Sequence, residues 1–243
     1  MRYKVTMAYN GLNYVGFQRQ KNGLAIQEVV EERLKTIFNH EVKTYMASRT
    51  DSGVHAFNQV FHFDEDKVIE DYKLKGALNG MLPKDIHILN VEKVGEDFHS
   101  RYSVKSKTYL YIINIGEYDV FLNGQAYQCP FKLDTELIKE GMKLFVGRHD
   151  FTSFNTSPLD LYPDQVREIY DFKMARKGDV LYLEITGNGF LRHMVRMIVG
   201  TLVDLGRGKK SLKDVEEMIK VPNKGTRRYN IDPNGLYLKM IYY

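Results

Sequence analysis

A chain of 243 residues is long enough for one large domain or two small ones, and 43% hydrophobic with 27% charged residues is typical of a soluble globular protein. The single cysteine, Cys129, excludes an internal disulfide and a thiolate metal cluster, and no apolar run reaches membrane-spanning length. The single cysteine favours a reducing cytoplasm, and because Met1–Lys4 leads directly into a strand-like segment, we expect no signal peptide.

The charged residues are grouped along the chain. Thirty-five Lys and Arg residues against 31 Asp and Glu residues give a net charge of +4. The basic groups lie at Arg101–Lys107, Arg192–Lys210 and Lys224–Arg228, and the acidic groups at Glu28–Glu32, Asp64–Asp71 and Asp214–Glu217. This separation is compatible with one positive face suited to a polyanion such as nucleic acid, and equally with ordinary solvated helix faces.

The first half of the chain alternates strand and helix patterns. The period of two over Lys4–Tyr9 predicts a strand, and the spacing of apolar residues from Ile26 to Phe38 predicts an amphipathic helix. Further on, the patterns predict a strand over Phe57–Phe63, a helix over Tyr72–Leu82 and a strand over Ile86–Val94.

The second half continues the alternation. We expect a strand over Lys105–Asn114, a helix over Thr135–Phe145, a hairpin of Val166–Arg176 with Val180–Thr186, helices over Phe190–Leu205 and Leu212–Val221, and a closing strand over Leu236–Tyr243. The fold class is therefore α/β or α+β, with two subdomains and a seam between residues 100 and 135.

The segment Ser48–Ala56 has the densest functional chemistry. Asp51 follows Arg49 by two residues, and a nearby opposite charge favours the ionised carboxylate. Gly53 allows a sharp turn or a close approach to a ligand. These residues are compatible with a catalytic aspartate, although Asp-Ser-Gly is also an ordinary turn sequence.

Other candidate motifs are less specific. In the predicted helix, Arg192 and Arg196 lie four residues apart and would share a face, either exposed to water or bound to phosphate or a buried carboxylate. The dense loop Gly147–Phe154 has no accompanying G-x-S-x-G nucleophile motif, and the seven histidines show no metal-binding spacing. Tyr109 is either a core residue or a stacking platform for a base.

Several motifs in order together resemble the bacterial tRNA pseudouridine synthase A family. The resemblance begins at Tyr9-Asn10-Gly11 and Tyr14-Val15-Gly16-Phe17-Gln18 and spans nearly the whole chain. Its other motifs are Arg49–Ala56, Thr108–Tyr111, Gly147–Phe154, Gly189–Arg196, Val199–Leu202, Gly206–Lys209 and Gly235–Leu238.

This resemblance implies a mixed, largely antiparallel sheet flanked by helices, built as two similar halves (1–104 and 105–243) around a central cleft. It makes Asp51 the essential catalytic carboxylate, acting at C1′ as a nucleophile or as the base that leads to a glycal. With Asp51, the resemblance makes Tyr109, Arg49 and Arg196 catalytic residues. Tyr109 would stack on the uracil and could take part in proton transfer at C5, Arg49 would help displace the target nucleotide, and Arg196 would pair with Asp51. The substrate-binding residues implied are Tyr109, Arg49, His55, Phe151, Arg192, His193, Arg207 and Lys209.

The resemblance also implies an isomerase that acts on the anticodon stem-loop of tRNA, at the positions numbered 38 to 40, as a homodimer without cofactor, metal or membrane. Three departures stand out: Asn10 replaces the usual aspartate, Ser48 and Ser52 replace the usual small residues around the Asp51 loop, and the tail Gly225–Gly235 differs from the family pattern. A paralogue that modifies another uridine and a non-catalytic RNA-binding module are the alternatives. A glycoside hydrolase is disfavoured because no second acid has a motif of its own.

Overall fold

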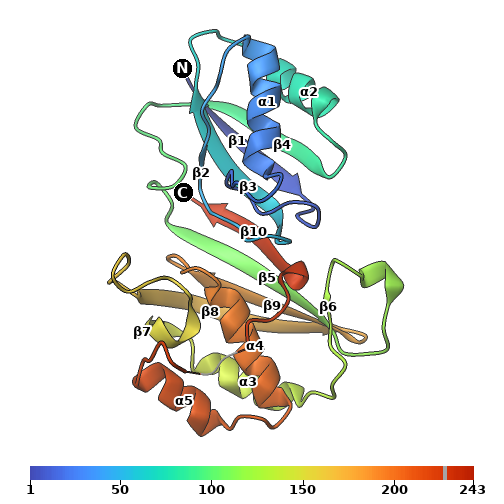
Figure 1. Cartoon of the computed structure of the whole chain (residues 1–243), viewed down its shortest axis with the longest axis vertical. Helices are drawn as coiled ribbons and strands as arrows, with labels where there is room; N and C mark the ends of the chain where they lie inside the picture. Colours follow the sequence, from blue (N-terminus) through green and yellow to red (C-terminus); the bar gives the residue numbers. More distant parts are fainter. Residues whose placement is uncertain (227–228) are drawn as a thin grey trace. The chain divides into compact units, whose positions relative to one another are not determined.

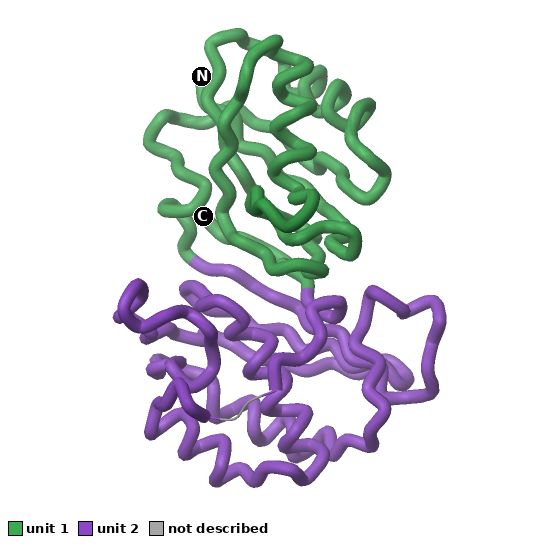
Figure 2. Tube along the Cα trace, in the orientation of Figure 1, with its two compact units in different colours: residues 1–105, 237–243 green, residues 106–236 purple. Residues whose placement is uncertain are grey.

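The computed structural model describes residues 1–226 and 229–243, and this part of the chain forms ten strands and five α-helices (Figure 1). The chain divides into two compact units, shown separately coloured in Figure 2. Unit 1 comprises Met1–Lys105 and Tyr237–Tyr243, and unit 2 comprises Ser106–Leu236. The last strand therefore returns to unit 1, whereas the sequence grouped it with the second half.

Unit 1 contains a mixed sheet with the strand order β4-β1-β3-β10. These strands are β1 (Arg2–Tyr9), β3 (His55–Asp64), β4 (Ile86–Val94) and β10 (Leu236–Tyr242), and the short β2 (Tyr45–Met46) also pairs with β3. β1 runs antiparallel to both β3 and β4, β2 runs antiparallel to β3, and β10 runs parallel to β3.

Two helices cover one face of this sheet (Figure 1). They are α1 (Ile26–Phe38) and α2 (Asp71–Met81). Alternate β1 residues, among them Val5 and Met7, are fully buried, and the ring of Phe38 in α1 lies 5.9 Å from that of Phe63 in β3. Because neighbouring strand residues point to opposite faces, the residues between these core positions lie on the face away from α1.

In unit 2 the strand order is β7-β8-β9-β5, with antiparallel pairing throughout that series. The strands are β5 (Ser106–Asn114), β7 (Gly147–Asp150), β8 (Val166–Lys177) and β9 (Val180–Gly187), with the short β6 (Tyr127–Gln128) parallel to β5. The helices are α3 (Thr135–Lys143), α4 (Met194–Gly206) and α5 (Leu212–Lys220), and three 3-10 turns are η1 (Val120–Leu122), η2 (Thr152–Phe154) and η3 (Pro233–Gly235).

The close packing of α3 against α4 forms much of the unit 2 core. A Cβ atom at Gly141 of α3 would lie only 2.4 Å from Leu205 Cδ2, so the glycine allows the two helices to approach. Nearly every residue of α4 is buried, which explains its almost uniformly apolar sequence. No helix in residues 1–226 or 229–243 is long and apolar enough to cross a membrane.

The sequence-based fold class and the major elements are confirmed, with two local corrections. The helix expected from Phe190 begins only at Met194, because His193 has a left-handed backbone (φ 62°) and the Thr156 N–H donates to the Arg192 carbonyl at 3.1 Å. The segment expected as a loop over Gly147–Phe154 instead forms β7, which pairs with β8, followed by η2.

Candidate active site

The loop that carries Asp51 connects β2 to β3 and is held by the loop that follows β1. The Phe17 N–H donates to the Thr50 carbonyl at 3.3 Å, and the Gly53 N–H donates to the Tyr14 carbonyl at 3.2 Å. Beneath them, the hydroxyls of Tyr9 and Thr50 form a buried hydrogen bond of 2.8 Å. The two motifs that the sequence placed forty residues apart are therefore one structural element.

Two glycines allow these loops to touch backbone to backbone. A Cβ atom at Gly11 would lie 1.9 Å from the Val54 carbonyl oxygen. Gly16 has φ +109°, and a Cβ atom there would lie 2.4 Å from the Thr50 carbonyl oxygen. Neither position has room for a side chain, so the path of the Asp51 loop depends on both glycines.

The two ends of the Asp51 loop are anchored by buried polar side chains. At one end, Gln59 donates from Nε2 to the Ser48 carbonyl (2.8 Å) and accepts from the Ser48 N–H (3.3 Å). At the other, the Gly11 N–H donates to Nδ1 of His55 at 3.1 Å. The loop thereby presents Asp51 partly exposed and Arg49 exposed.

His55 lies within this support. It is buried, and its ring stacks on Tyr237 with the centroids 4.6 Å apart. Its contacts with Gly11 and Tyr237 give it a structural role, and its expected contact with the substrate stays a prediction.

The remaining expected site residues belong to unit 2. Tyr109 lies in β5 and is largely buried, and the ring of Phe190 is nearly perpendicular to its own, with the centroids 5.2 Å apart. Arg196 lies in the first turn of α4, where its Nε donates to the Ile231 carbonyl at 2.8 Å. Phe151 is fully buried and packs against Phe154 at 6.2 Å, which makes it a core residue of this unit.

Arg192 and His193 precede α4 and do not belong to it. The expected alignment of Arg192 with Arg196 along one helix face is therefore wrong, because Arg192 is exposed in the turn before the helix. His193 Nδ1 lies 2.9 Å from the Thr156 hydroxyl, which fixes the imidazole against the loop after β7. The turn still places Arg192, His193 and Arg196 close together at one end of α4.

Arg207 and Lys209 lie at the other end of the same helix. Thirteen helical residues span about 20 Å, so these cations form a second group. The Arg207 guanidinium lies 3.2 Å from the centre of the Phe131 ring, and Lys209 is exposed. In the third basic group, Arg227 and Arg228 lie outside the described residues.

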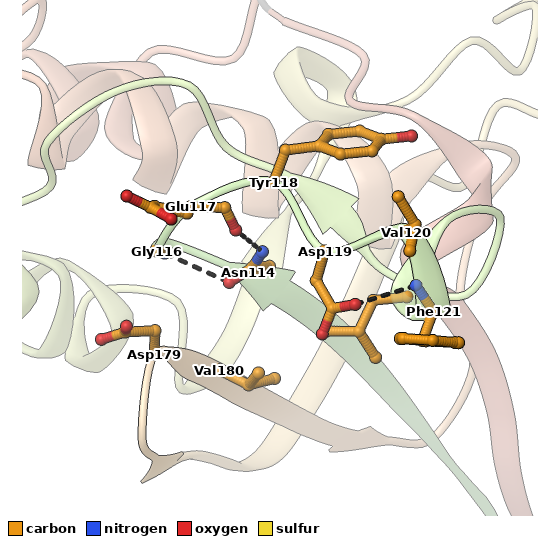
Figure 3. Close-up of a pocket in the computed structure, with 10 residues that line it drawn as sticks. Asn114, Gly116, Glu117, Tyr118, Asp119, Val120, Phe121, Asp179 and Val180 are labelled. Carbon is orange, nitrogen blue, oxygen red and sulfur yellow. Dashed lines mark hydrogen bonds between the residues drawn. The ribbon is translucent and has the colours of Figure 1, made fainter.

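A hollow of about 440 Å³ lies elsewhere in unit 2 (Figure 3). The loop after β5 and the start of β9 form it, and Asn114 fixes that loop by donating to the Glu117 carbonyl at 2.7 Å. None of the expected site residues lines it. No group of three His, Cys, Asp or Glu side chains that could hold a metal occurs among the described residues.

The bracing residues Gly11 and Gln59 were missed from the sequence. A signal was present for Gln59, because a glutamine within an apolar strand requires hydrogen-bond partners when it is buried. Gly11 was named only within the Tyr9-Asn10-Gly11 motif, and its contact with Val54 could not be foreseen because the two residues lie more than forty positions apart.

Comparison with known proteins identifies the family. The model of the tRNA pseudouridine synthase family matches residues 5–103 and 142–243. Proteins named tRNA pseudouridine synthase A from Bacillus licheniformis, Anoxybacillus flavithermus and Exiguobacterium sibiricum are 40%, 37% and 38% identical over 100% of this chain and 99%, 98% and 96% of their own lengths. A solved Cbf5–Nop10–Gar1 complex contains a chain with a TM-score of 0.38 and 13% identity, over 83% of this chain and 45% of that one, too distant to carry an inference.

The braced carboxylate loop and the mixed, mostly antiparallel α/β fold thus occur in an enzyme of RNA modification. The chain belongs to the tRNA pseudouridine synthase family. It is an isomerase that converts uridine to pseudouridine in tRNA.

Proposed function

We propose that this isomerase acts on uridines in the anticodon stem-loop of tRNA and that Asp51 is its essential carboxylate. The observation that carries the assignment is the Asp51 loop, which buried hydrogen bonds of Gln59 and His55 hold at both ends. A rigid support of this kind holds a reacting group in position without a further entropic cost at the moment of reaction.

The reaction breaks the bond between uracil N1 and ribose C1′, turns the base and joins C5 to C1′. The proton on C5 leaves and N1 gains one, so atoms and electrons balance without an oxidant or a phosphate donor. Asp51 serves this sequence either by attacking C1′ or by removing a ribose proton to give a glycal. Both routes require the ionised carboxylate, which Arg196 would stabilise.

The other expected residues act on binding and access. Tyr109 would stack on the target uracil and exclude water, and Arg49 would occupy the space that the displaced nucleotide leaves in the RNA. Arg192, His193, Arg207 and Lys209 would bind backbone phosphates, which gives an affinity that falls with salt. The exposure of Arg49, Arg192 and Lys209 supports these roles.

The proposal also includes the oligomeric state of the protein and its cellular compartment. The family resemblance supports a homodimer, and sedimentation at several protein concentrations tests it. The single cysteine, Cys129, which is buried and has no partner for an internal disulfide, supports the reducing cytoplasm proposed as the compartment.

The test is tritium release from tRNA transcripts labelled at C5 of uridine, with Asp51→Asn beside the wild type. We expect Asp51→Asn to bind tRNA and release no tritium, because an amide is neither a nucleophile nor a base. Asp66→Asn, at an exposed loop position after β3, is the matched control and should release tritium normally. Release by Asp51→Asn would exclude the assigned role, and release mapped outside the anticodon stem-loop would exclude the proposed target.

A further inference from the structure

Unit 1 carries a series of four rings that passes from its core to its surface. Tyr45 stacks on His62 with centroids 5.0 Å apart and planes at 17°. His99 lies 5.9 Å from Tyr45, and Tyr102 lies 4.4 Å from His99. His62 is 1% exposed, whereas Tyr45 is 37% and Tyr102 is 77% exposed. Tyr45 and Tyr102 therefore expose ring surface to the solvent, and the buried ring of His62 lies beneath Tyr45.

This series lies on the sheet face that α1 leaves uncovered. Phe63 in β3 contacts Phe38 of α1, so the preceding residue, His62, points to the opposite face. Tyr45 is paired directly with His62 in the β2–β3 ladder and shares that face. Tyr45 is 37% exposed on the sheet face opposite α1, so its ring is accessible to a partner such as a nucleic acid.

Hydrogen bonds fix the support beneath the exposed rings. The Ser100 hydroxyl donates to the Tyr45 carbonyl at 2.5 Å, and the Ser100 N–H donates to His62 Nδ1 at 3.2 Å. The Arg101 N–H donates to His99 Nδ1 at 3.1 Å, which holds the turn that carries Tyr102. Rings that are already positioned lose little conformational freedom when a ligand stacks on them.

Positive charge accompanies the two exposed tyrosines. Lys43 Nζ lies 5.2 Å from the Tyr45 ring centre, and the Arg101 guanidinium carbon lies 5.8 Å from that of Tyr102. Both cations are exposed. The nearby carboxylate of Asp64 is neutralised by Arg2 through two hydrogen bonds of 2.7 Å. Aromatic faces beside exposed cations favour a ligand that has both flat rings and negative charge.

We propose that Tyr45 and Tyr102 form a stacking platform for an unpaired nucleotide of the tRNA substrate, with Lys43 and Arg101 binding its flanking phosphates. Unpaired bases in RNA are commonly recognised by aromatic stacking next to cations. This inference rests on the proposed function, because it adds a contact for the same RNA.

The platform is separate from the Asp51 loop. His62 and His55 lie seven residues apart on β3, about 23 Å along the strand, and the Asp51 loop closes on Val54 with a hydrogen bond of 3.2 Å from the Val54 N–H to the Asp51 carbonyl. The nucleotide on the platform is therefore a different one from the target uridine. The platform contributes to the affinity for tRNA and to the alignment of the tRNA with the Asp51 loop.

The test measures the Kd for an unmodified tRNA transcript with Tyr102→Ala, Tyr102→Phe and a matched control. The control is Tyr72→Ala on α2, where the tyrosine is 71% exposed and Lys73 Nζ lies 5.8 Å from its ring centre. We expect Tyr102→Ala to raise Kd about 5- to 150-fold, the range for loss of one base stack, and Tyr102→Phe to keep wild-type affinity. Arg101→Ala should lower the slope of log affinity against log salt by about one.

The outcomes separate the platform from the proposed function. If the wild type binds and modifies tRNA while Tyr102→Ala binds as tightly, the platform is wrong and the proposed function stands. If the wild type neither binds nor modifies tRNA, the proposed function is wrong, and the platform that rests on it is overturned as well. If Tyr102→Ala changes the sedimentation coefficient of the protein without changing the Kd for tRNA, the rings form a protein interface and the platform is overturned.

Discussion

The contact between Gly11 and Val54 gives the sharpest prediction about the active site. An alanine at position 11 would place its Cβ atom 1.9 Å from the Val54 carbonyl oxygen, whereas Cβ contacts under 3.0 Å are essentially never seen. The two segments must therefore separate by about 1.1 Å. Because the Val54 N–H is bonded to the Asp51 carbonyl, we expect the displacement to reach the catalytic loop.

A misplacement of about 1 Å at a reacting group can cost about 100-fold in rate. We expect Gly11→Ala to lower kcat for pseudouridine formation by about that factor, measured as tritium release at saturating tRNA. The affinity for tRNA should change little, because the exposed cations that bind phosphates lie outside this contact. A matched control is Gly76→Ala in α2, where a Cβ atom meets nothing within 4 Å.

Wild-type kcat in Gly11→Ala, in a protein with unchanged thermal unfolding, would refute the coupling between the two loops. Equal loss of activity in Gly11→Ala and Gly76→Ala would also refute it, since the control leaves the loop untouched. A loss of tRNA affinity as large as the loss of kcat would show that the contact serves binding.

Two further predictions concern stability. Burial, reinforced by the positive charges of His99 and Arg2, lowers the pKa of His62 from 6.5 to about 4. As the pH falls, the unfolded chain binds a proton at His62 before the folded chain does, so the free energy of unfolding should drop by about 3 kcal/mol between pH 6.5 and 4. Urea unfolding of His62→Asn should lack this decrease. An identical dependence on acid pH in the two proteins would contradict the prediction. At α5, Ser211 and Asp214 form a reciprocal cap, and we expect Ser211→Ala to lower the free energy of unfolding by about 1 kcal/mol; an unchanged urea midpoint would show that the cap is dispensable.

Elements whose own side chains decide their structure were predictable from sequence. β1 alternates buried and half-buried residues along its whole length, and every apolar residue of α1 except the half-buried Ile37 is buried. The start of α4 was not predictable, because Phe190–His193 has no helix-breaking residue. The Arg192 carbonyl accepts a hydrogen bond from the Thr156 N–H, and this tertiary contact overrides the local helical pattern.

The same limit applies to the site. The motif around Asp51 identified the catalytic loop, because a carboxylate, a guanidinium and a turn glycine stand together in sequence. Its support comes from Gly11, which meets the loop only when β1 pairs with β3, and from Gln59, which meets it only when β2 pairs with β3. Short strands such as β7 were missed for a similar reason, since four residues carry too little pattern without their partner β8.

The return of the chain to unit 1 imposes an order on biosynthesis. The ribosome must complete all of Ser106–Leu236 before β10 emerges to pair with β3 beside His55. At typical elongation rates this interval is on the order of ten seconds, during which that edge of β3 lacks its parallel partner. During this interval the newly made first 105 residues are most open to edge pairing with other chains. The pairing of β10 with β3 ends this exposure, and the same strand supplies Tyr237, which stacks on His55 beneath the Asp51 loop.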